Sequence, residues 1–192
     1  MNEHQLIRQV IQKERTAFTE LVELYKERVY NTALGLIQCH EEAEDISQEV
    51  FIEIYQSIAR FREESKLSTW IYRITVQKSL EMIRKKSRKK RAGNILSLFG
   101  KEHLVTTPTS APFYHPGVKM ENKERAAILF SAIARLPENQ KTAFTLHKVE
   151  DLSYNESASI MEVTLSSVES LMFRSKQNIK KLLADYYEKN EQ

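Results

Sequence analysis

The sequence predicts an all-α protein with two small helical domains joined by a flexible linker. Apolar residues recur at steps of three and four in both halves of the 192-residue chain, and no stretch shows the two-residue alternation of a β-strand. Three of the four glycines and three of the four prolines lie between residues 92 and 118. Because these residues interrupt regular structure, we expect domains at 1–91 and 121–192, with the linker at 92–120.

The apolar spacing predicts three helices directly, two in the first domain and one in the second. Their apolar faces consist of Phe18, Val22, Tyr25, Val29, Ala33 and Leu36, then Ala43, Ile46, Val50, Ile54, Ile58 and Phe61, and finally Ala126, Leu129, Phe130, Ile133 and Leu136. Pro137 is expected at the first position of the next helix, where the missing N–H of proline costs nothing.

The positive charge of the chain is concentrated in one place. The formal net charge is +3, yet seven of the eight residues from 84 to 91 are Lys or Arg, so the rest of the chain is net acidic. Such a run indicates contact with a polyanion, or else a solvated helix end. The single cysteine, Cys39, excludes an internal disulfide, and the chain has neither an apolar run of about 20 residues nor a signal-peptide core. We therefore expect a cytoplasmic protein.

Residues 41–59 of the second predicted helix are acidic and contain no Lys or Arg. Acids in a first turn favour the helix dipole, which explains those before residue 45. Asp45, Glu49 and Glu53 are spaced at i, i+4, where like charges cost a few tenths of a kcal/mol. This stripe, with Gln48 and Ile52 beside it, is either a solvated face or a surface for a basic partner.

No group of residues indicates catalysis or metal binding. The five histidines are scattered, and the adjacent Cys39 and His40 have no further ligands at a recognisable spacing. Paired carboxylates can act as acid–base catalysts, but no nucleophile or pocket signature accompanies those of the acidic helix. We expect no catalytic residue, no metal site and no cofactor.

The segment from residue 68 to 91 is predicted to be a helix with a polar stripe between two apolar sides. On a helical wheel, Lys66, Arg73, Gln77 and Arg84 fall within about 40° of one another. The apolar sides are formed by Leu67, Ile71 and Ile74 and, nearly opposite, by Val76, Leu80 and Ile83. We expect a helix held between neighbours with one edge free. Trp70 borders the stripe, so the edge suits bases and phosphates, although a core tryptophan beside a solvated face is the alternative.

A helix-turn-helix motif is predicted over 152–183. Ser153 and Glu156 form a capping box for its first helix, and either Thr164 or Ser166 caps the second. The inward face of the second helix is assigned to Leu165, Val168, Met172, Ile179 and Leu182, and the outward face to Ser166, Ser170, Phe173, Gln177 and Lys181, with Arg174 at the margin. Small hydroxyls followed by cations suit a helix in the major groove, although any surface helix can show this distribution.

Taken together, these segments resemble the extracytoplasmic-function sigma factors of bacterial RNA polymerase. "EEAEDISQEVFIEIY" is similar to the core-polymerase-binding helix of that family, and "FREESKLSTWIYRITVQKSLEMIRKK" to its promoter-melting segment. "LPENQKTAFTLHKVEDLSYNESASIMEVTLSSVESLMFRSKQNIKKLL" resembles its C-terminal DNA-binding domain. The resemblance runs in the expected order from about residue 15 to residue 183, so it is more specific than a helix-turn-helix alone.

The resemblance implies partners and a role for each matching position. The chain would bind core polymerase through the β′ clamp helices and the β flap, and the residues implied at the clamp are Asp45, Gln48, Glu49 and Ile52. Contacts to the minus-ten element, including capture of a flipped base by the loop 61–66, are implied for Phe61, Lys66, Ser68, Thr69, Trp70, Arg73, Gln77, Arg84 and Arg88. Contacts to the minus-thirty-five element are implied for Thr164, Ser166, Ser167, Ser170, Arg174 and Lys176. An anti-sigma factor, commonly anchored in the membrane, is the implied regulator, and no small-molecule substrate is implied.

Four positions depart from the usual pattern of this family. Gln77 and Glu81 replace Asn and Asp in the melting helix, which keeps the functional group and lengthens the arm. Glu162 stands where glycine is common, and a side chain at positive φ costs about 1 kcal/mol. Ser157 replaces an apolar residue, which predicts a less stable domain.

Two other classes of protein fit parts of the sequence. A stand-alone regulator would use the helix-turn-helix without polymerase, and it would bind duplex DNA by itself in a gel-shift experiment. An enzyme acting on DNA would need one of the eight tyrosines as nucleophile, but no cluster of His, Arg and Lys accompanies any of them.

Overall fold

The structure is a computed structural model that describes residues 2–98 and 123–190. Every regular element in these two segments is a helix, which confirms the predicted all-α class. Residues 99–122, which include most of the predicted linker, lie outside the described part of the chain.

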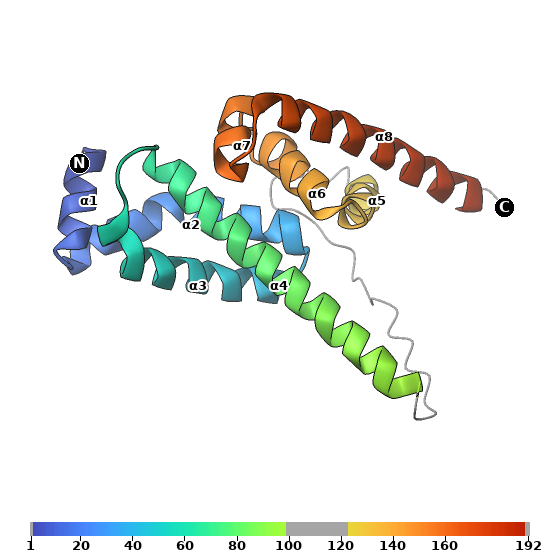
Figure 1. Ribbon diagram of the computed structural model, residues 1–192, viewed down its shortest axis with the longest axis horizontal. Coiled ribbons are helices and arrows are strands. Elements are labelled where there is room, and N and C mark those ends of the chain that lie inside the picture. The colour runs from blue at the N-terminus through green and yellow to red at the C-terminus, as the bar shows by residue number, and fades with distance from the viewer. Residues whose placement is uncertain (1, 99–122, 191–192) are drawn as a thin grey trace.

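The N-terminal unit consists of four helices. These are α1 (Glu3–Ile11), α2 (Arg15–Ile37), α3 (His40–Ser57) and α4 (Leu67–Leu98), with a 3-10 turn, η1 (Ile58–Arg60), directly after α3. Helices α2, α3 and α4 pack against one another, while α1 lies across the end at which α2 begins (Figure 1).

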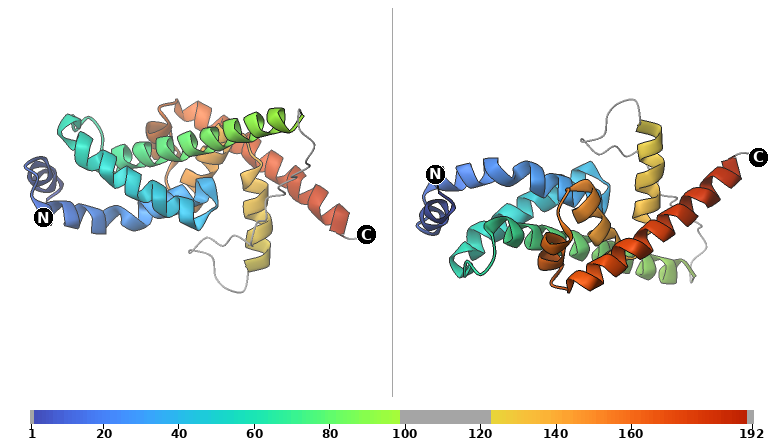
Figure 2. Two further views of the ribbon diagram at one scale, coloured as in Figure 1. Left: turned by 90° about the horizontal axis from the view of Figure 1, so that it is seen from below. Right: turned by 90° about the horizontal axis from the view of Figure 1, so that it is seen from above.

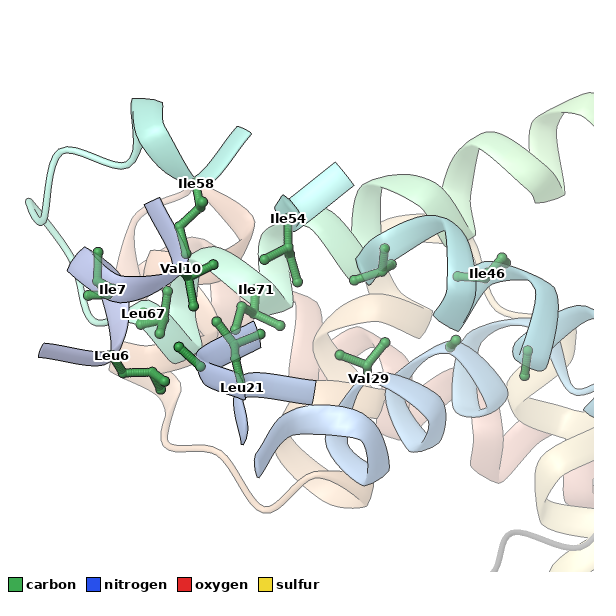
Figure 3. Packing of buried hydrophobic residues seen from close by; sticks show 14 of the residues in the cluster. Leu6, Ile7, Val10, Leu21, Val29, Ile46, Ile54, Ile58, Leu67 and Ile71 are labelled. Atoms are coloured by element: carbon green, nitrogen blue, oxygen red, sulfur yellow. The ribbon is translucent and has the colours of Figure 1, made fainter. Parts of the chain in front are cut away.

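One apolar cluster joins these four helices. Its members include Leu21, Val29, Ile46, Ile54 and Leu67, none of them more than 1% exposed. Figure 3 shows these side chains directed toward one another between the helices. Burial of each such side chain contributes about 1.5–3 kcal/mol, so the helical spacing visible in the sequence accounts for the packing of this unit.

Helix α4 is apolar on two opposite sides, as the sequence predicts. Leu67 and Ile71 belong to the cluster shared with α2 and α3, whereas Val76 and Leu80 belong to a cluster shared with the C-terminal half of the chain. The helix continues to Leu98, past the boundary expected at residue 91. A single glycine at position 93 costs a helix only about 1 kcal/mol, so it does not end α4.

The C-terminal unit consists of four further helices. They are α5 (Lys123–Ala134), α6 (Glu138–Phe144), α7 (Tyr154–Met161) and α8 (Leu165–Asn190), and a π-helical turn, η3 (Thr145–Val149), extends α6. Phe130, Ile133 and Ile179 hold α5 against α8 in one cluster, and Val168 and Met172 pack α8 against α6 and α7 in another. The long N-terminal part of α8 thus forms the spine of this unit.

Pro137 precedes α6 and does not form part of it. It is the N-cap, with φ −54° and ψ 146°, and the helix begins at Glu138. The expectation that Pro137 occupies the first helical position is therefore wrong by one residue. Its extended ψ angle places it outside the helix, while the φ angle that the proline ring fixes still suits the entry of the chain.

The two units pack against each other through α2 and α4 on one side and η3 and α7 on the other (Figures 1 and 2). The apolar part of this contact contains five buried residues, Leu36, Tyr72, Val76, Leu146 and Ile160. The backbone of α2 comes so close to η3 that a Cβ added to Gly35 would lie 2.7 Å from Cγ2 of Thr145. Glycine at this position therefore permits the close approach.

Candidate nucleic-acid interface

The polar stripe of α4 lies along one edge of the helix. Gln77 and Arg84 are exposed, whereas Trp70 and Arg73 are half-buried. The Trp70 ring packs against the ring of Phe61 at a centroid distance of 5.2 Å, so the loop before α4 is fixed to the stripe by an aromatic contact. Gln77 Nε2 donates to Oε1 of Glu81 at 3.2 Å, one turn further along. Aromatic, amide and guanidinium groups are thus brought together as the sequence predicts.

Thr69 is the member of the predicted minus-ten set that does not reach the surface. Its side chain is 7% exposed and lies on the buried side of α4, whereas its neighbour Ser68 is half-buried. At 100° per residue, position 69 lies beside the stripe, on the side of α4 that carries Val76 and packs against the C-terminal unit. The structure therefore corrects the expectation of a surface role for Thr69.

The predicted free edge of α4 is contacted by the C-terminal unit at Arg73 and Arg84. Arg73 donates from Nε and Nη2 to the carbonyl oxygen of Ser159, at 3.0 and 2.7 Å, and its Nη1 lies 3.4 Å from Oε1 of Glu162. Arg84 pairs with Glu138 at 3.0 Å. These partners come from α6 and from α7 with its following turn, which lie far away in the sequence, so helical periodicity within α4 contained no signal for them.

One carboxylate of the acidic stripe of α3 has a cationic partner within the chain, and the rest of the stripe is exposed. Asp45, Gln48 and Glu49 are exposed, and Ile52 is 57% exposed. Glu53 differs, because its Oε2 lies 3.7 Å from Nζ of Lys78 on α4. The stripe that needs an external partner is therefore shorter than the sequence indicates.

The helix-turn-helix forms from α7, a short turn and α8. The Ser153 Oγ accepts from the backbone N–H of Glu156 at 3.2 Å, and the Glu156 carboxylate accepts from the backbone N–H of Ser153 at 3.0 Å, which confirms the capping box. Thr164, one of the two candidate caps, accepts from the backbone N–H of Ser167 at 3.2 Å. The turn thus starts α8 at Leu165.

Most of the outward face of α8 is as predicted. Ser166, Arg174 and Lys176 are exposed and Ser170 is half-buried. Leu165 was expected to face inward but is 41% exposed, because the first residue of α8 precedes the part that packs on α6 and α7.

Phe173 lies on the outward face of α8 but was not among the predicted site residues. It is 63% exposed, an unusual position for a large aromatic side chain, and it lies three residues after Ser170 on the same face. The helical spacing from Ser170 could have indicated this position from the sequence. An exposed aromatic ring suits contact with a thymine methyl group.

Glu162 adopts the left-handed conformation that its position suggested. Its φ is 55° and its ψ is 40°, at the C-cap of α7. We expect Glu162→Gly to raise the free energy of unfolding by about 1 kcal/mol, because glycine adopts this conformation without the steric cost of a Cβ. Urea denaturation followed by circular dichroism measures the change.

Glu162→Ala is the control for that measurement. It removes the carboxylate that faces Arg73 but keeps the Cβ, so the difference between the glycine and alanine variants isolates the backbone effect. Equal stabilities of the two variants would contradict the strain argument.

Ser157 lies fully buried in α7, and its hydroxyl has no hydrogen-bond partner among the described residues. An unsatisfied buried hydroxyl costs about 1–3 kcal/mol. This supports the expectation that serine at a position usually apolar weakens the domain.

A partly buried polar pair joins the two units and was not predicted. The Tyr72 hydroxyl on α4 donates to Oε2 of Glu150, which follows η3, at 3.4 Å. Burial raises the pKa of Glu150 to about 7, while the hydrogen bond from Tyr72 and the nearby Arg28 act in the opposite direction. Burial, and then the Glu150 charge, also raise the pKa of Tyr72, so it remains a donor. Seventy-eight residues separate the pair, and no local pattern marks it.

Neither a metal site nor a membrane span is found in residues 2–98 and 123–190. No three His, Cys, Asp or Glu side chains come together in a way that could hold a metal ion. None of the helices combines the length and the apolar composition needed to cross a bilayer.

A cationic helix beside a helix-turn-helix, with an exposed acidic surface on a third element, defines the chain as a DNA-binding transcription protein. Two families match it: Sigma-70 region 2 over residues 21–89, and Sigma-70 region 4 over residues 121–179. The ECF RNA polymerase sigma-E factor of Haemophilus influenzae is 32% identical over 179 residues, which cover 93% of this chain and 94% of the relative. The ECF RNA polymerase sigma factor SigW of Bacillus subtilis is 29% identical over 180 residues, covering 93% and 95%. The chain belongs to the extracytoplasmic-function sigma factors of RNA polymerase.

Two solved structures share the fold. CnrH, in complex with the cytosolic domain of CnrY, aligns over 95% of this chain and 97% of its own, with a TM-score of 0.66 and 17% identity. RpoE of Bartonella quintana, in complex with the anti-sigma factor NepR, aligns over 87% and 96%, with a TM-score of 0.63 and 19% identity. Both likenesses extend over the N-terminal and C-terminal halves, as the resemblance in sequence does.

Proposed function

We propose that this sigma factor uses three separate surfaces to direct core RNA polymerase to promoters. The exposed part of the α3 stripe, Asp45, Gln48, Glu49 and Ile52, binds the β′ clamp helices. The α4 stripe and the loop before it bind the minus-ten element, and α8 binds the minus-thirty-five element. The observation that supports this division is that all three surfaces occur in one chain, in the order in which the matched regions occur. The β flap is the proposed partner of the C-terminal domain.

The proposed domains are 1–91 for region 2 and 121–192 for region 4, with 92–120 as the linker that connects them. The matched ranges, 21–89 and 121–179, fall inside the two domains. The chain supplies promoter recognition and strand opening, while the bond-forming chemistry belongs to the polymerase. We place this work in the cytoplasm, where both partners are found.

An anti-sigma factor is the proposed regulator. The support is indirect: RpoE of Bartonella quintana, which shares the fold, is described in complex with the anti-sigma factor NepR. An anti-sigma factor that binds α3 or α4 would block polymerase or DNA. Anchoring of that partner in a membrane is part of the proposal. A stand-alone regulator is less well supported, since the family match includes region 2 as well as the helix-turn-helix.

Replacing Arg73 and Gln77 by alanine is expected to slow promoter opening at least about tenfold while leaving initial duplex binding within about twofold. Both side chains lie on the stripe, where they would contact bases only after the strands separate. Permanganate reactivity of unpaired thymines, measured with core polymerase present, reports the opening.

The matched control is the double variant Arg8→Ala and Gln12→Ala. Arg8 lies in α1, and Gln12 directly follows that helix. This variant removes the same two residue types at the same spacing from another exposed surface. Identical permanganate patterns for the stripe variant and the wild type would remove Arg73 and Gln77 from the minus-ten site.

A further inference from the structure

Helix α1 packs against both ends of the loop 61–66, which lies between η1 and α4. Ile58 of η1 precedes the loop and Leu67 of α4 follows it, and both side chains are fully buried. Ile7 and Val10 of α1 belong to the same apolar cluster, and Figure 3 shows them beside these two residues. The cluster therefore fixes where the loop leaves the core of the N-terminal unit and where it returns.

A polar contact joins α1 to the middle of this loop. The Nδ1 atom of His4 lies 2.5 Å from Oε2 of Glu63, although the two residues are 59 positions apart. An ionised carboxylate only accepts hydrogen bonds, so the imidazole N–H is the donor. On either side of Glu63, the exposed Arg62 and Glu64 side chains pair with each other at 3.9 Å. Glu63 is thus turned toward α1, whereas its two neighbours project into solvent.

The backbone of Glu63 adopts the left-handed conformation, with a φ of 57°. A residue with a Cβ adopts this conformation at a steric cost, so other contacts must stabilise it in the folded protein. The hydrogen bond from His4 is such a contact. It also occupies the Glu63 carboxylate, which would otherwise be free to turn toward, and repel, the phosphates of a bound strand.

Neither α1 nor His4 belongs to the three surfaces proposed above. The match to Sigma-70 region 2 begins at residue 21, after α1 ends, and none of the residues implied for the minus-ten element lies in this helix. The side chains of His4 and Glu63 are 65% and 41% exposed, and pairs this exposed add little to stability. The contact is therefore expected to affect the position of the loop more than the unfolding of the domain.

We propose that His4 is a positioning residue for promoter opening. By donating to Glu63, it holds the loop 61–66 in the conformation that receives the flipped base of the minus-ten element. The inference rests on the proposed minus-ten role of this loop. A loop that is ordered before the base arrives loses less conformational freedom on binding, so the captured base is held more tightly.

Replacing His4 by alanine should slow promoter opening about threefold in the presence of core polymerase, in keeping with the small energy of an exposed pair. Permanganate reactivity of unpaired thymines, followed over time, measures the rate. Initial binding of the duplex should not change, because the loop receives a base only after the strands separate. The matched control Arg8→Ala removes another exposed side chain one turn later on α1 and should open promoters at the wild-type rate. A wild-type rate of opening in His4→Ala would refute the positioning role.

A conservative variant distinguishes positioning from a general effect on α1. The side-chain amide of His4→Asn reaches the place of the histidine Nδ1 atom and can donate to the same carboxylate. His4→Asn should therefore restore most of the rate that His4→Ala loses. Equally slow opening by the alanine and asparagine variants would show that the hydrogen bond is not the cause, and would overturn the proposal.

A double-mutant cycle shows whether His4 acts through Glu63. If it does, adding His4→Ala to Glu63→Ala should change the opening rate by less than about 1.5-fold, because the partner is already absent. Retention of the full His4→Ala effect in the Glu63→Ala background would contradict the proposed route.

Trp70 reports the position of the loop without DNA or polymerase. It is the only tryptophan of the chain, and the Phe61 ring of the loop packs against it at a centroid distance of 5.2 Å. Acrylamide quenching of Trp70 in the full-length chain should increase in His4→Ala and remain at the wild-type level in Arg8→Ala. Unchanged quenching in His4→Ala would show that the loop keeps its position without the contact, which is the opposite of the inference.

A loop variant separates this inference from the proposed function. Phe61→Ala together with Lys66→Ala removes two of the side chains proposed to contact the minus-ten element, so it should slow opening. Normal opening by this variant would refute the proposed role of the loop, whatever the result for His4. Slow opening by this variant, with normal opening by His4→Ala, would refute only the positioning role of His4.

Discussion

Reversing Asp45 and Glu49 to lysine should weaken binding of core RNA polymerase by about one hundredfold, or about 2.7 kcal/mol. Both carboxylates are exposed on α3, and within the described residues neither forms an ion pair. A stripe of like charges that has no internal partner is best explained by a basic surface elsewhere. Titration of labelled core polymerase with the purified variant measures the loss.

The control for this experiment is Glu14→Lys with Glu20→Lys. These residues are also exposed, and the change in net charge is the same, so a general electrostatic effect would appear in both variants. If the two double variants bind polymerase equally well, α3 is not the docking surface. The folded state of each variant is checked by its circular dichroism.

Replacing Glu150 by glutamine should stabilise the protein at pH 8 by about 2–3 kcal/mol and have little effect near pH 4. Burial raises the pKa of this carboxyl from 4.5 to about 7 in the folded state. The neutral form can still accept the hydrogen bond from Tyr72, and glutamine keeps the carbonyl oxygen that accepts it. Urea denaturation of the wild type and the variant between pH 4 and pH 8 measures the difference.

The direction of this effect follows from proton binding. Between pH 4.5 and pH 7 the folded wild type holds a proton on Glu150 that the unfolded chain has lost, so wild-type stability falls as the pH rises through that window. The positive charge of Arg28 limits the fall by lowering the Glu150 pKa. Because Glu150 lies where the two units meet, its ionisation above pH 7 also disfavours their docking.

Glu156→Gln is a control, because Glu156 affects the pH dependence of stability in the opposite direction to Glu150. Hydrogen bonds from the Ser153 hydroxyl and backbone lower the pKa of Glu156, so its contribution is present above the unfolded pKa and is lost as the pH falls. The free energy of unfolding of the wild type should fall between pH 5 and pH 8 relative to that of Glu150→Gln. If the difference between the two proteins does not change over this range, Glu150 is solvated in the folded protein.

The helices and the helix-turn-helix could be predicted because their signals are local. The predicted apolar residues of α3 and α5 face the core, and so do most of those of α2, where Leu21 and not Val22 is the buried residue. The Ser153 capping box depends on residues three apart. Errors occurred at the ends of elements, where Pro137 lies outside α6 and Leu165 is exposed at the start of α8. A single residue of offset decides those positions, and periodicity does not specify it.

The sequence predicted which residues form the candidate surfaces, but not which of those residues are exposed. The sequence placed Arg73, Gln77 and Arg84 on one stripe and gave α4 two apolar sides, and the structure agrees. It could not show that Glu53 is neutralised by Lys78, or that Thr69 is buried. Each of these depends on a neighbouring helix and on how deeply α4 is set between the others.

The amino-acid pattern alone therefore determined the helical class, the two domains, the capping residues and the family, because each depends on neighbours within one or two helical turns or on motifs along the chain. Only the tertiary structure revealed that α7 packs against α4, that Tyr72 donates a hydrogen bond to Glu150, and that the absence of a side chain at Gly35 leaves room for Thr145. These contacts join residues that are far apart in the chain. Their formation depends on how two apolar surfaces fit together in space, which no local spacing records.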